Sequence, residues 1–249
     1  MAECVWIVLP TYDEAENLGG VVATARTALA GERLTVLVVD DGSPDGTGAL
    51  ADELAAAHEW VRVLHRPGKG GLGKAYVAGF AEALAAGADL VVEMDADFSH
   101  DAADLPRLLA AVRDGADVAL GSRYVEGGGV ENWHWLRRAV SRGGCRYARE
   151  VLGVPVRDLT GGFKCFRASA LEAIDYDTVR SQGYAFQVEL TYRALRRGLR
   201  VVELPITFRE RREGQSKMTG RIAVEAIWLV PGLRLAASRK RALRPMQHR

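Results

Sequence analysis

Residues Leu90 to Asp104 read LVVEMDADFSHDAAD, and this stretch decides how the rest of the chain is interpreted. The apolar run Leu90 to Val92 is typical of a short buried strand, and it is followed by Asp95-Ala96-Asp97. Two carboxylates at the carboxyl end of a buried strand point into the crevice where open α/β sheets bind ligands. Carboxylates and phosphate oxygens together suit Mg²⁺ or Mn²⁺. The stretch therefore indicates either a divalent-metal site or a polar turn, because Asp is also common in turns.

The composition is that of an ordinary globular protein. The chain has 249 residues, of which 48% are hydrophobic and 26% charged, and its formal net charge is +1. This length favours one large α/β domain or two small ones. A net charge near zero argues against a general nucleic-acid binder, so we expect no nucleic-acid partner.

The sequence predicts neither a signal peptide nor a transmembrane helix. The first apolar run, Val5 to Leu9, is short and is followed by Pro10 and acidic residues. The nearest candidate span, Ile222 to Ala237, contains Glu225 and Arg234, whereas a membrane-spanning helix needs about 20 apolar residues. Three widely spaced cysteines match no metal-ligand or disulfide pattern, which favours a reducing compartment.

The C-terminal segment is basic. No acidic residue follows Glu225, whereas six cationic residues follow it: Arg234, Arg239, Lys240, Arg241, Arg244 and Arg249. An amphipathic segment with a basic tail can lie on an anionic membrane surface. The same composition suits a solvated terminus, and the sequence leaves both interpretations open.

Short apolar segments alternate with helical ones through the first half of the chain. We expect strands at 4–9, 34–39, 61–65, 90–92 and 118–121, with helices between them that end near residues 30, 58, 86 and 113. This alternation is typical of a mostly parallel sheet with helices on both faces. The second half is less regular, with expected helices at 137–152, 186–197 and 219–239, the last kinked at Pro231, and extended segments at 163–167 and 201–208, the second broken at Pro205. We expect one continuous α/β domain.

The first two expected strands also end in acidic, turn-forming loops. Tyr12 and Glu14 follow the first strand, and Asp40 and Asp41 follow the second. Because the carboxyl ends of neighbouring parallel strands converge on one crevice, these side chains are candidates for stacking on a base and for hydrogen bonding to a base or ribose. The choice between the two adjacent aspartates is open.

The glycine-rich loop Gly68 to Ala75, GKGGLGKA, comes close to a phosphate-binding P-loop. That motif requires Ser or Thr after its lysine, because the hydroxyl binds Mg²⁺. Ala75 stands at this position. A P-loop phosphotransferase is therefore a distant alternative, and the loop suits nucleotide binding in other architectures.

Cationic residues follow or surround the acidic segments. They are Arg123, after the strand at 118–121, the neighbours Arg137 and Arg138, and Arg211 and Lys217 in a highly charged loop. Arginine binds phosphate through two parallel hydrogen bonds, and lysine acts as a point charge. Together with the two aspartates, this set indicates a site for several phosphate groups.

Three motifs occur in an order that resembles a known enzyme family. They are VLPTYDE at 8–14, VVDDGSPDGT at 38–47 and MDADFSH at 94–100. On these motifs the chain resembles inverting family-2 glycosyltransferases with a GT-A fold. Four later motifs, GSRY at 121–124, ENW at 131–133, TGGF at 160–163 and RREGQSK at 211–217, resemble the dolichol-phosphate (polyprenol-phosphate) mannosyltransferases in particular.

The resemblance implies a role for each matching residue. It implies that guanosine is held by Pro10, Tyr12, Glu14, Val38 and Asp40. It places Asp95, Ala96 and Asp97 at the diphosphate, with both aspartates on Mg²⁺ or Mn²⁺. The lipid phosphate would contact Arg123 and Arg137, with Arg138 as the alternative register, and Arg211 and Lys217 would bind phosphate groups of donor or acceptor. Catalysis would then depend on Asp95, Asp97, Arg123 and Arg137.

The implied reaction is inverting transfer of mannose from GDP-mannose to a polyprenyl monophosphate, which gives polyprenyl phosphomannose and GDP. A sister enzyme that uses UDP-glucose or another UDP-sugar is the alternative, because no residue pattern separates guanine from uracil decisively.

The resemblance also divides the chain. It implies a GT-A catalytic domain at 1–220, followed at 221–249 by an amphipathic helix and basic tail that belong to the same domain or associate with a membrane. Some relatives carry membrane helices after this domain. We therefore expect a cytoplasmic protein, peripheral on the cytoplasmic face of the membrane, held there by its own C-terminal segment or by a separate membrane-anchoring protein.

Overall fold

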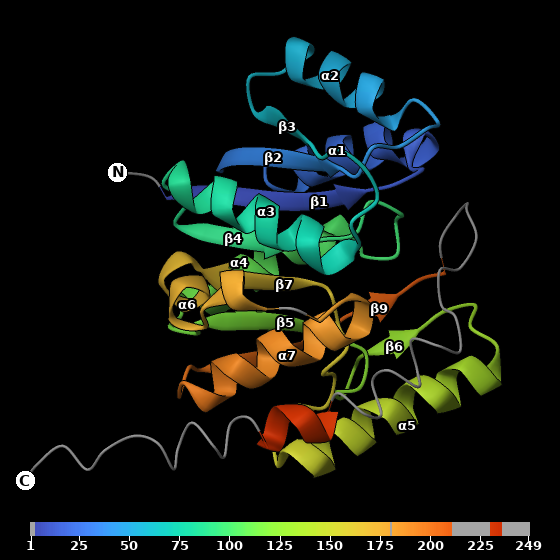
Figure 1. Cartoon of the computed structure of the whole chain (residues 1–249), viewed down its shortest axis with the longest axis vertical. Helices are drawn as coiled ribbons and strands as arrows, with labels where there is room; N and C mark the ends of the chain where they lie inside the picture. The colour runs from blue at the N-terminus through green and yellow to red at the C-terminus, as the bar shows by residue number, and fades with distance from the viewer. Residues whose placement is uncertain (1–2, 180, 211–229, 236–249) are drawn as a thin grey trace, which may run out of the picture.

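A mixed, mostly parallel sheet forms the centre of the molecule. The computed structural model of the chain describes residues 3–179, 181–210 and 230–235 (Figure 1). Seven strands lie in the order β3-β2-β1-β4-β7-β5-β8, and β6 pairs with β9 in a separate two-stranded sheet. β7 runs antiparallel to its neighbours β4 and β5, and the other pairs are parallel. The strands are β1 (Cys4–Thr11), β2 (Arg33–Asp40), β3 (Val61–His65), β4 (Leu90–Glu93), β5 (Val118–Ser122), β6 (Gly129–Val130), β7 (Lys164–Arg167), β8 (Val201–Pro205) and β9 (Thr207–Phe208).

Helices cover both faces of the large sheet (Figure 1). They are α1 (Ala15–Ala28), α2 (Thr47–Ala57), α3 (Leu72–Ala85), α4 (Leu105–Arg113), α5 (Trp135–Leu152), α6 (Ala168–Ala173) and α7 (Gly183–Arg196), with short 3₁₀ turns at η1 (Ala102–Asp104) and η2 (Tyr176–Thr178). The fold class predicted from the alternation of elements is therefore confirmed.

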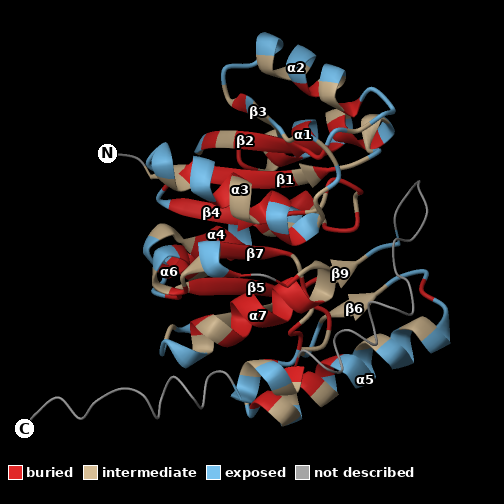
Figure 2. Cartoon of the chain, viewed as in Figure 1, coloured by how far each residue is buried: buried red, intermediate tan, exposed pale blue. Residues whose placement is uncertain are grey.

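Alternate side chains of β1 belong to two different apolar cores. Val5, Ile7 and Leu9 pack with buried residues of α1, α2 and α4. Trp6 and Val8 pack with α3, α6 and α7 on the other face. This alternation follows from the two-residue period of a strand, and it explains why the strands are buried on both sides while the outer helix faces are exposed (Figure 2).

Gly79 allows α3 to pack closely against the sheet. A Cβ at this position would lie 2.3 Å from Cγ1 of Val8, so any larger residue would push the helix outward. The same helix carries the glycine-rich loop at its start and Tyr76 in its second turn. Close packing at Gly79 therefore fixes both features relative to the carboxyl ends of the strands.

The predicted break at Pro205 is confirmed: the segment at 201–208 is two strands, β8, which ends at Pro205, and β9, which pairs with β6 in the small sheet. The two-residue strand β6 is not predicted from the sequence. The six-residue helix α6 is not predicted from the sequence, since it is too short to show a helical period.

Only part of the predicted C-terminal helix lies within the described residues. Residues 230–235 are helical, and Val230 packs with Leu152 of α5 and Tyr192 of α7. The rest of the helix predicted at 219–239, and the tail behind it, lie outside the described residues. In the part of the chain that is described, no helix combines the length and apolarity needed to cross a bilayer.

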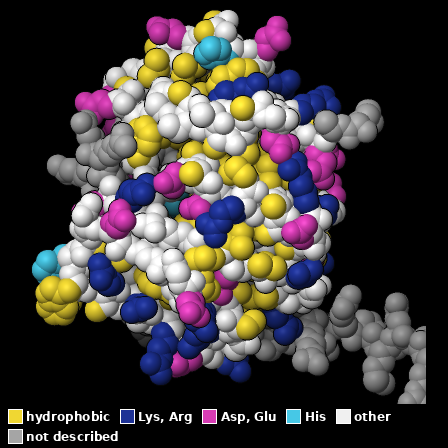
Figure 3. Space-filling view, turned by 180° about the vertical axis from the view of Figure 1, so that it is seen from behind, with side chains coloured by type: hydrophobic (Ala, Val, Ile, Leu, Met, Phe, Trp, Pro, Cys, Tyr) yellow, Lys and Arg dark blue, Asp and Glu magenta, His cyan; other side chains and the backbone are white. Residues whose placement is uncertain are grey.

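The face opposite to that of Figure 1 shows acidic and basic side chains interspersed (Figure 3).

Candidate active site

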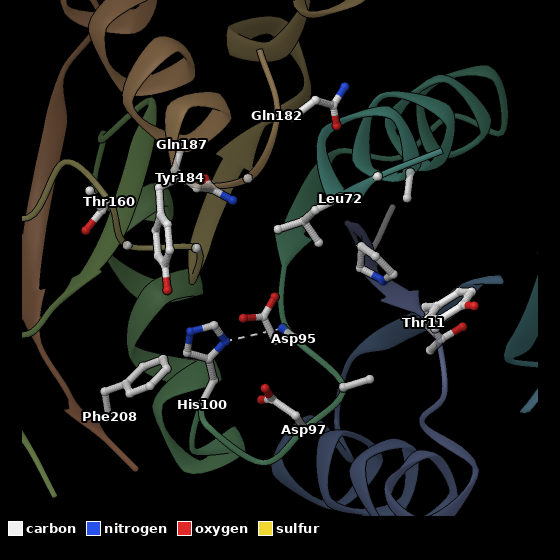
Figure 4. Close-up of a pocket in the computed structure, with 18 of the residues that line it drawn as sticks. Thr11, Leu72, Asp95, Asp97, His100, Thr160, Gln182, Tyr184, Gln187 and Phe208 are labelled. Carbon is white, nitrogen blue, oxygen red and sulfur yellow. Dashed lines mark hydrogen bonds between the residues drawn. The ribbon is translucent and has the colours of Figure 1, made fainter. Parts of the chain in front are cut away.

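A cavity of about 360 Å³ lies at the carboxyl ends of β1, β4 and β5 and beside the first turns of α3 and α7 (Figure 4). Parallel α/β sheets bind ligands at this edge. Eight residues predicted from the sequence line it: Pro10, Tyr12, Glu14, Asp95, Ala96, Asp97, Arg123 and Arg137. The predicted phosphate ligands Arg211 and Lys217 lie outside the described residues.

Asp41, and not Asp40, lines the cavity. Asp41 Oδ2 accepts hydrogen bonds from the backbone N–H groups of Gly70 and Gly71, at 2.9 and 3.1 Å, and its Oδ1 pairs with Arg66. The amides that would cradle phosphate in a P-loop therefore donate to a carboxylate. Together with Ala75, this contact argues against the P-loop alternative.

Asp40 and Val38 lie behind the cavity wall. Asp40 Oδ1 accepts a hydrogen bond from Ser43 Oγ at 2.5 Å, and the side chain of Val38 is fully buried in the core beside α1. Neither residue is among those that line the cavity. Guanosine binding by these two residues stays a prediction, and the structure favours Asp41 as the aspartate that faces a ligand.

Hydrogen bonds join the loops after β1 and β2. Thr47 Oγ1 accepts from the backbone N–H of Glu14 at 3.0 Å, and Asp45 accepts from that of Ala15 at 3.1 Å. The Lys69 ammonium lies 3.8 Å from the ring centroid of Tyr12, which is a cation–π contact. These contacts hold Tyr12 and Glu14 on one wall of the cavity.

Asp95 and Asp97 project from the loop after β4 to the same side, where His100 lies (Figure 4). Asp95 Oδ1 accepts from the Tyr76 hydroxyl at 3.2 Å, and Asp97 Oδ1 accepts from the backbone N–H of Ser99 at 3.0 Å. His100 Nδ1 accepts from the backbone N–H of Asp95 at 3.2 Å, so its proton is on Nε2. Burial lowers the pKa of His100 to about 4, which keeps the ring neutral.

The two aspartates fit a divalent cation that also binds a diphosphate. Among the described residues, no cluster of three or more His, Cys, Asp and Glu side chains forms a complete metal cage. Mg²⁺ is usually held by one or two carboxylates together with phosphate oxygens and water. The pair Asp95 and Asp97 at the cavity wall meets that requirement.

Arg123 is less accessible than the sequence predicts. Its Nε and Nη2 each donate to an oxygen of Asp158 at 2.7 Å, and Nη2 also donates to Thr160 Oγ1 at 2.7 Å. Arg123 is 4% exposed and Asp158 is fully buried. Burial opposes both charges, but the attraction outweighs it: the pKa of Asp158 is lowered and that of Arg123 raised. Contact of Arg123 with a lipid phosphate stays a prediction.

Arg137, and not Arg138, lines the cavity. Its guanidinium lies 4.1 Å from the ring centroid of Trp133 and pairs with Glu210 at 2.8 Å. Arg138 is exposed and donates to the backbone carbonyl of Val130 at 3.2 Å. Of the two neighbouring arginines, the structure thus favours Arg137 as the one that contacts a ligand.

A second buried ion pair lies behind the cavity. Lys164 Nζ donates to Glu93 Oε2 at 3.3 Å and to Gln187 Oε1, and all three side chains are almost completely buried. Burial lowers the pKa of Lys164 and raises that of Glu93 to about 7, although their mutual attraction opposes both shifts.

Several of these residues are not predicted from the sequence. His100 lies inside the stretch 90–104, and Asp158 stands two residues before the TGGF motif, so both had a local signal. Lys164 and Gln187 had none, because their partners lie 71 and 23 residues away from Lys164.

A family model described as "Glycosyl transferase family 2" matches residues 6–175. The chain belongs to glycosyl transferase family 2. This family member is 52% identical over 225 residues to "Polyprenol monophosphomannose synthase" of Mycolicibacterium smegmatis, across 90% of the chain and 84% of the relative. It is 50% identical over 233 residues to "Undecaprenyl-phosphate mannosyltransferase" of Micrococcus luteus, across 94% and 95%. The protein is therefore an enzyme of the glycosyltransferase type.

Two further similarities are more distant. "Dolichol-phosphate mannosyltransferase" of Pyrococcus furiosus is 36% identical over 89% of the chain, which spans 61% of that relative. A crystal structure of glucosyl-3-phosphoglycerate synthase from Mycobacterium tuberculosis with Mn²⁺ and UDP-glucose has a TM-score of 0.70 at 19% identity, over 93% of this chain and 79% of that one. At that identity the likeness shows the fold alone.

Proposed function

We propose that the protein transfers mannose from GDP-mannose to a polyprenyl monophosphate, with inversion, and gives polyprenyl phosphomannose and GDP. The observation that carries the proposal is the similarity at 52% and 50% identity to two proteins named for polyprenyl-phosphate mannose transfer. The cavity adds independent support, since one loop supplies two aspartates and α5 supplies an arginine that lines the opposite wall.

The two walls of the cavity suit two substrates. Tyr12, Glu14 and Asp41 lie on the β1–β2 side, where a nucleoside would bind. Arg137 lies on the other side, where its guanidinium would hold the phosphate of the lipid. Asp95 and Asp97 lie between them and would hold Mg²⁺ or Mn²⁺, which, when bound, neutralises charge on the diphosphate leaving group.

The acceptor needs positioning more than a base. A phosphate monoester has its second pKa at about 6, so it is an anion near neutral pH without help from the protein. One of its oxygens forms a bond to the anomeric carbon from the face opposite the diphosphate, and the bond from that carbon to the diphosphate breaks. The protein then contributes by bringing two anions together in the correct orientation. The neutral His100 beside Asp95 is held by its own hydrogen bond and need not accept a proton from the acceptor.

The lipid acceptor requires access to a membrane surface. We infer that the protein is peripheral on the cytoplasmic face, held by its basic C-terminal segment or by a separate membrane-anchoring protein. The charge pattern after Glu225 supports this inference.

A donor competition tests the function. Purified protein, Mg²⁺ or Mn²⁺ and a detergent-solubilised polyprenyl phosphate are given GDP-mannose, UDP-glucose or ATP, and the lipid product is identified by mass spectrometry. We expect mannolipid from GDP-mannose alone. A glucolipid from UDP-glucose would keep the reaction class and replace the donor, and the absence of any sugar-bearing lipid would contradict the proposal.

The variant Asp97→Ala should reduce turnover by about a thousandfold or more, because it removes a proposed metal ligand. The matched control is Asp104→Ala. Asp104 ends the following 3₁₀ turn η1, pairs with Arg107 and does not line the cavity. Initial rates of mannolipid formation measure both variants. Full activity of Asp97→Ala would rule out its role.

A further inference from the structure

A buried amide donor faces the cavity. Gln187, on α7, is 2% exposed and lines the cavity. Its Nε2 makes no hydrogen bond of ordinary geometry within the described residues. The amide lies close enough to Glu93 to lower the pKa of that carboxyl, but an NH₂ group has two donor hydrogens, so at least one is available to a ligand. Leaving a buried donor unpaired destabilises a protein, and such groups are rare in native structures. The feature therefore calls for a ligand that supplies an acceptor.

The orientation of this amide is fixed from behind. Lys164 Nζ donates to Gln187 Oε1 and to Glu93 Oε2. An ammonium group has only donors, so the amide oxygen must face Lys164 and the NH₂ group must face away from it. In Figure 4 the amide nitrogen points to the side of the cavity on which Asp95 and Leu72 lie.

Two glycines lie beside the amide on its open side. A Cβ at Gly162 would lie 3.3 Å from Gln187 Nε2, so the glycine leaves this approach clear. Gly161 and Gly162 both line the cavity beside the amide. The space next to Nε2 is thus bounded by backbone and can admit part of a ring.

The chemistry of the donor favours a neutral oxygen. Phosphate groups are typically held by arginine, lysine or metal ions, and those candidates lie elsewhere on the cavity wall at Asp95, Asp97 and Arg137. The amide of Gln187 is uncharged, and its own oxygen is already occupied by Lys164. It can therefore only donate, and a sugar hydroxyl oxygen is a matching acceptor.

We propose that Gln187 Nε2 donates a hydrogen bond to a hydroxyl oxygen of the donor hexose, with Lys164 and Glu93 holding the amide in that orientation, and that this bond contributes to the choice of sugar. The inference rests on the proposed function, because its ligand is the sugar of a nucleotide sugar. It names a specificity-determining residue that the sequence pattern did not reveal.

Binding measurements separate the sugar from the rest of the donor. Calorimetric titration gives the dissociation constants of GDP-mannose and of GDP for the wild-type protein and for Gln187→Met, which keeps the length of the side chain and removes the amide. We expect about tenfold weaker binding of GDP-mannose, the loss typical of one neutral hydrogen bond, and unchanged binding of GDP.

Two further variants frame this result. Thr191→Val is the matched control, because Thr191 is buried one turn along α7 and bonds to the backbone carbonyl of Gln187 without lining the cavity. It should leave both dissociation constants unchanged. Gly162→Ala should weaken the binding of GDP-mannose and leave the binding of GDP unchanged, because the added methyl group crowds Gln187 Nε2.

A second test changes the ligand instead of the protein. A set of GDP-mannose analogues, each lacking one hydroxyl of the sugar, identifies the oxygen that accepts the bond. One deoxy analogue should bind to the wild-type protein about tenfold more weakly than GDP-mannose does. To the Gln187→Met variant, that analogue and GDP-mannose should bind equally well.

Three results would overturn the inference. Equal weakening of GDP and GDP-mannose binding by Gln187→Met, or weaker binding of the lipid phosphate alone, would assign the amide to a phosphate. The third is an equal, about tenfold loss of affinity for every deoxy analogue in both the wild-type protein and the variant. If the wild-type protein instead uses UDP-glucose, the proposed function is wrong as to donor, and the same comparison with UDP-glucose and UDP decides the role of Gln187 separately.

Discussion

Two buried ion pairs lie beside the same cavity and behave differently. Arg123 and Asp158 form a bidentate salt bridge with two hydrogen bonds of 2.7 Å, and Arg123 also donates to Thr160. Lys164 and Glu93 share a single contact of 3.3 Å, and Glu93 Oε1 has no partner among the described residues. The pKa of Asp158 is lowered, whereas that of Glu93 is raised to about 7. Burial raises the pKa of both carboxyls, and only the closer, two-bond contact of Asp158 with Arg123 outweighs it; Glu93 also lies near the charge of Asp95.

The largest effect should come from breaking the first pair. Asp158→Ala leaves a buried guanidinium that cannot lose its proton, and it removes the acceptor for the backbone N–H of Arg123. We expect a loss of about 3–5 kcal/mol in the free energy of unfolding, which is typical when one partner of a buried pair is removed. Urea denaturation measures it. A loss below about 1 kcal/mol would mean that water or another group reaches Arg123.

Breaking the second pair should cost less. Lys164→Met removes the cation beside Glu93, but burial already raises the pKa of Glu93 to about 7, so this carboxyl can take up a proton and become neutral. The expected loss is about 2 kcal/mol, the scale of one buried polar group left unpaired. The same denaturation experiment compares the two variants, and a larger loss than that of Asp158→Ala would reverse the proposed order.

A smaller change should follow from Tyr76→Phe. The variant removes the hydroxyl that donates to Asp95 Oδ1 and leaves the stacked ring contacts with Phe80 and Phe186 in place. We expect a loss of about 1 kcal/mol in unfolding free energy and weaker binding of Mn²⁺, because Asp95 is then less firmly oriented. Thermal unfolding and a Mn²⁺ titration measure the two effects. Unchanged values of both would make the hydroxyl dispensable.

The smallest expected effect is a pH dependence of the stability that Asp158 contributes, and it is confined to acid pH. The pKa of Asp158 in the folded protein lies below its ordinary value of 3.8. Its stabilising effect is therefore complete above the unfolded-state pKa and is lost as the pH falls through the folded-state pKa. The stability advantage of the wild-type protein over Asp158→Asn should be constant from pH 7 to 5 and should shrink below pH 4. An advantage that already declines between pH 7 and 5 would contradict the lowered pKa.

The sequence predicted one wall of the cavity better than the other. Tyr12, Glu14, Asp95 and Asp97 each follow a strand directly, so a local pattern marks them. Adjacent residues at the end of a strand point to opposite sides of the sheet. Whether Asp40 or Asp41 faces the cavity therefore depends on the register of β2, and a shift of one residue would exchange the two.

The other wall depends on contacts that no local pattern encodes. Arg123 and Asp158 are 35 residues apart, and Glu93 and Lys164 are 71 apart. Lys164 begins a four-residue strand, KCFR, that ends in a second cation, Arg167, so the sequence alone does not mark Lys164 as buried. Buried charges of this kind become visible only when the partner strand is placed beside them, and β7 enters the sheet in the reverse direction.

The reversed strand β7 also bears on how the chain folds during synthesis. β4 pairs with β1 on one side, but its other edge is covered only by β7, with Leu90 opposite Arg167, 77 residues later. At a synthesis rate of about 5–20 residues per second, this apolar edge waits roughly 4–15 s for its partner. Exposed edges of this kind invite pairing with other chains. The nascent protein therefore has a period in which a chaperone that shields residues 90–93 would raise the yield of folded enzyme.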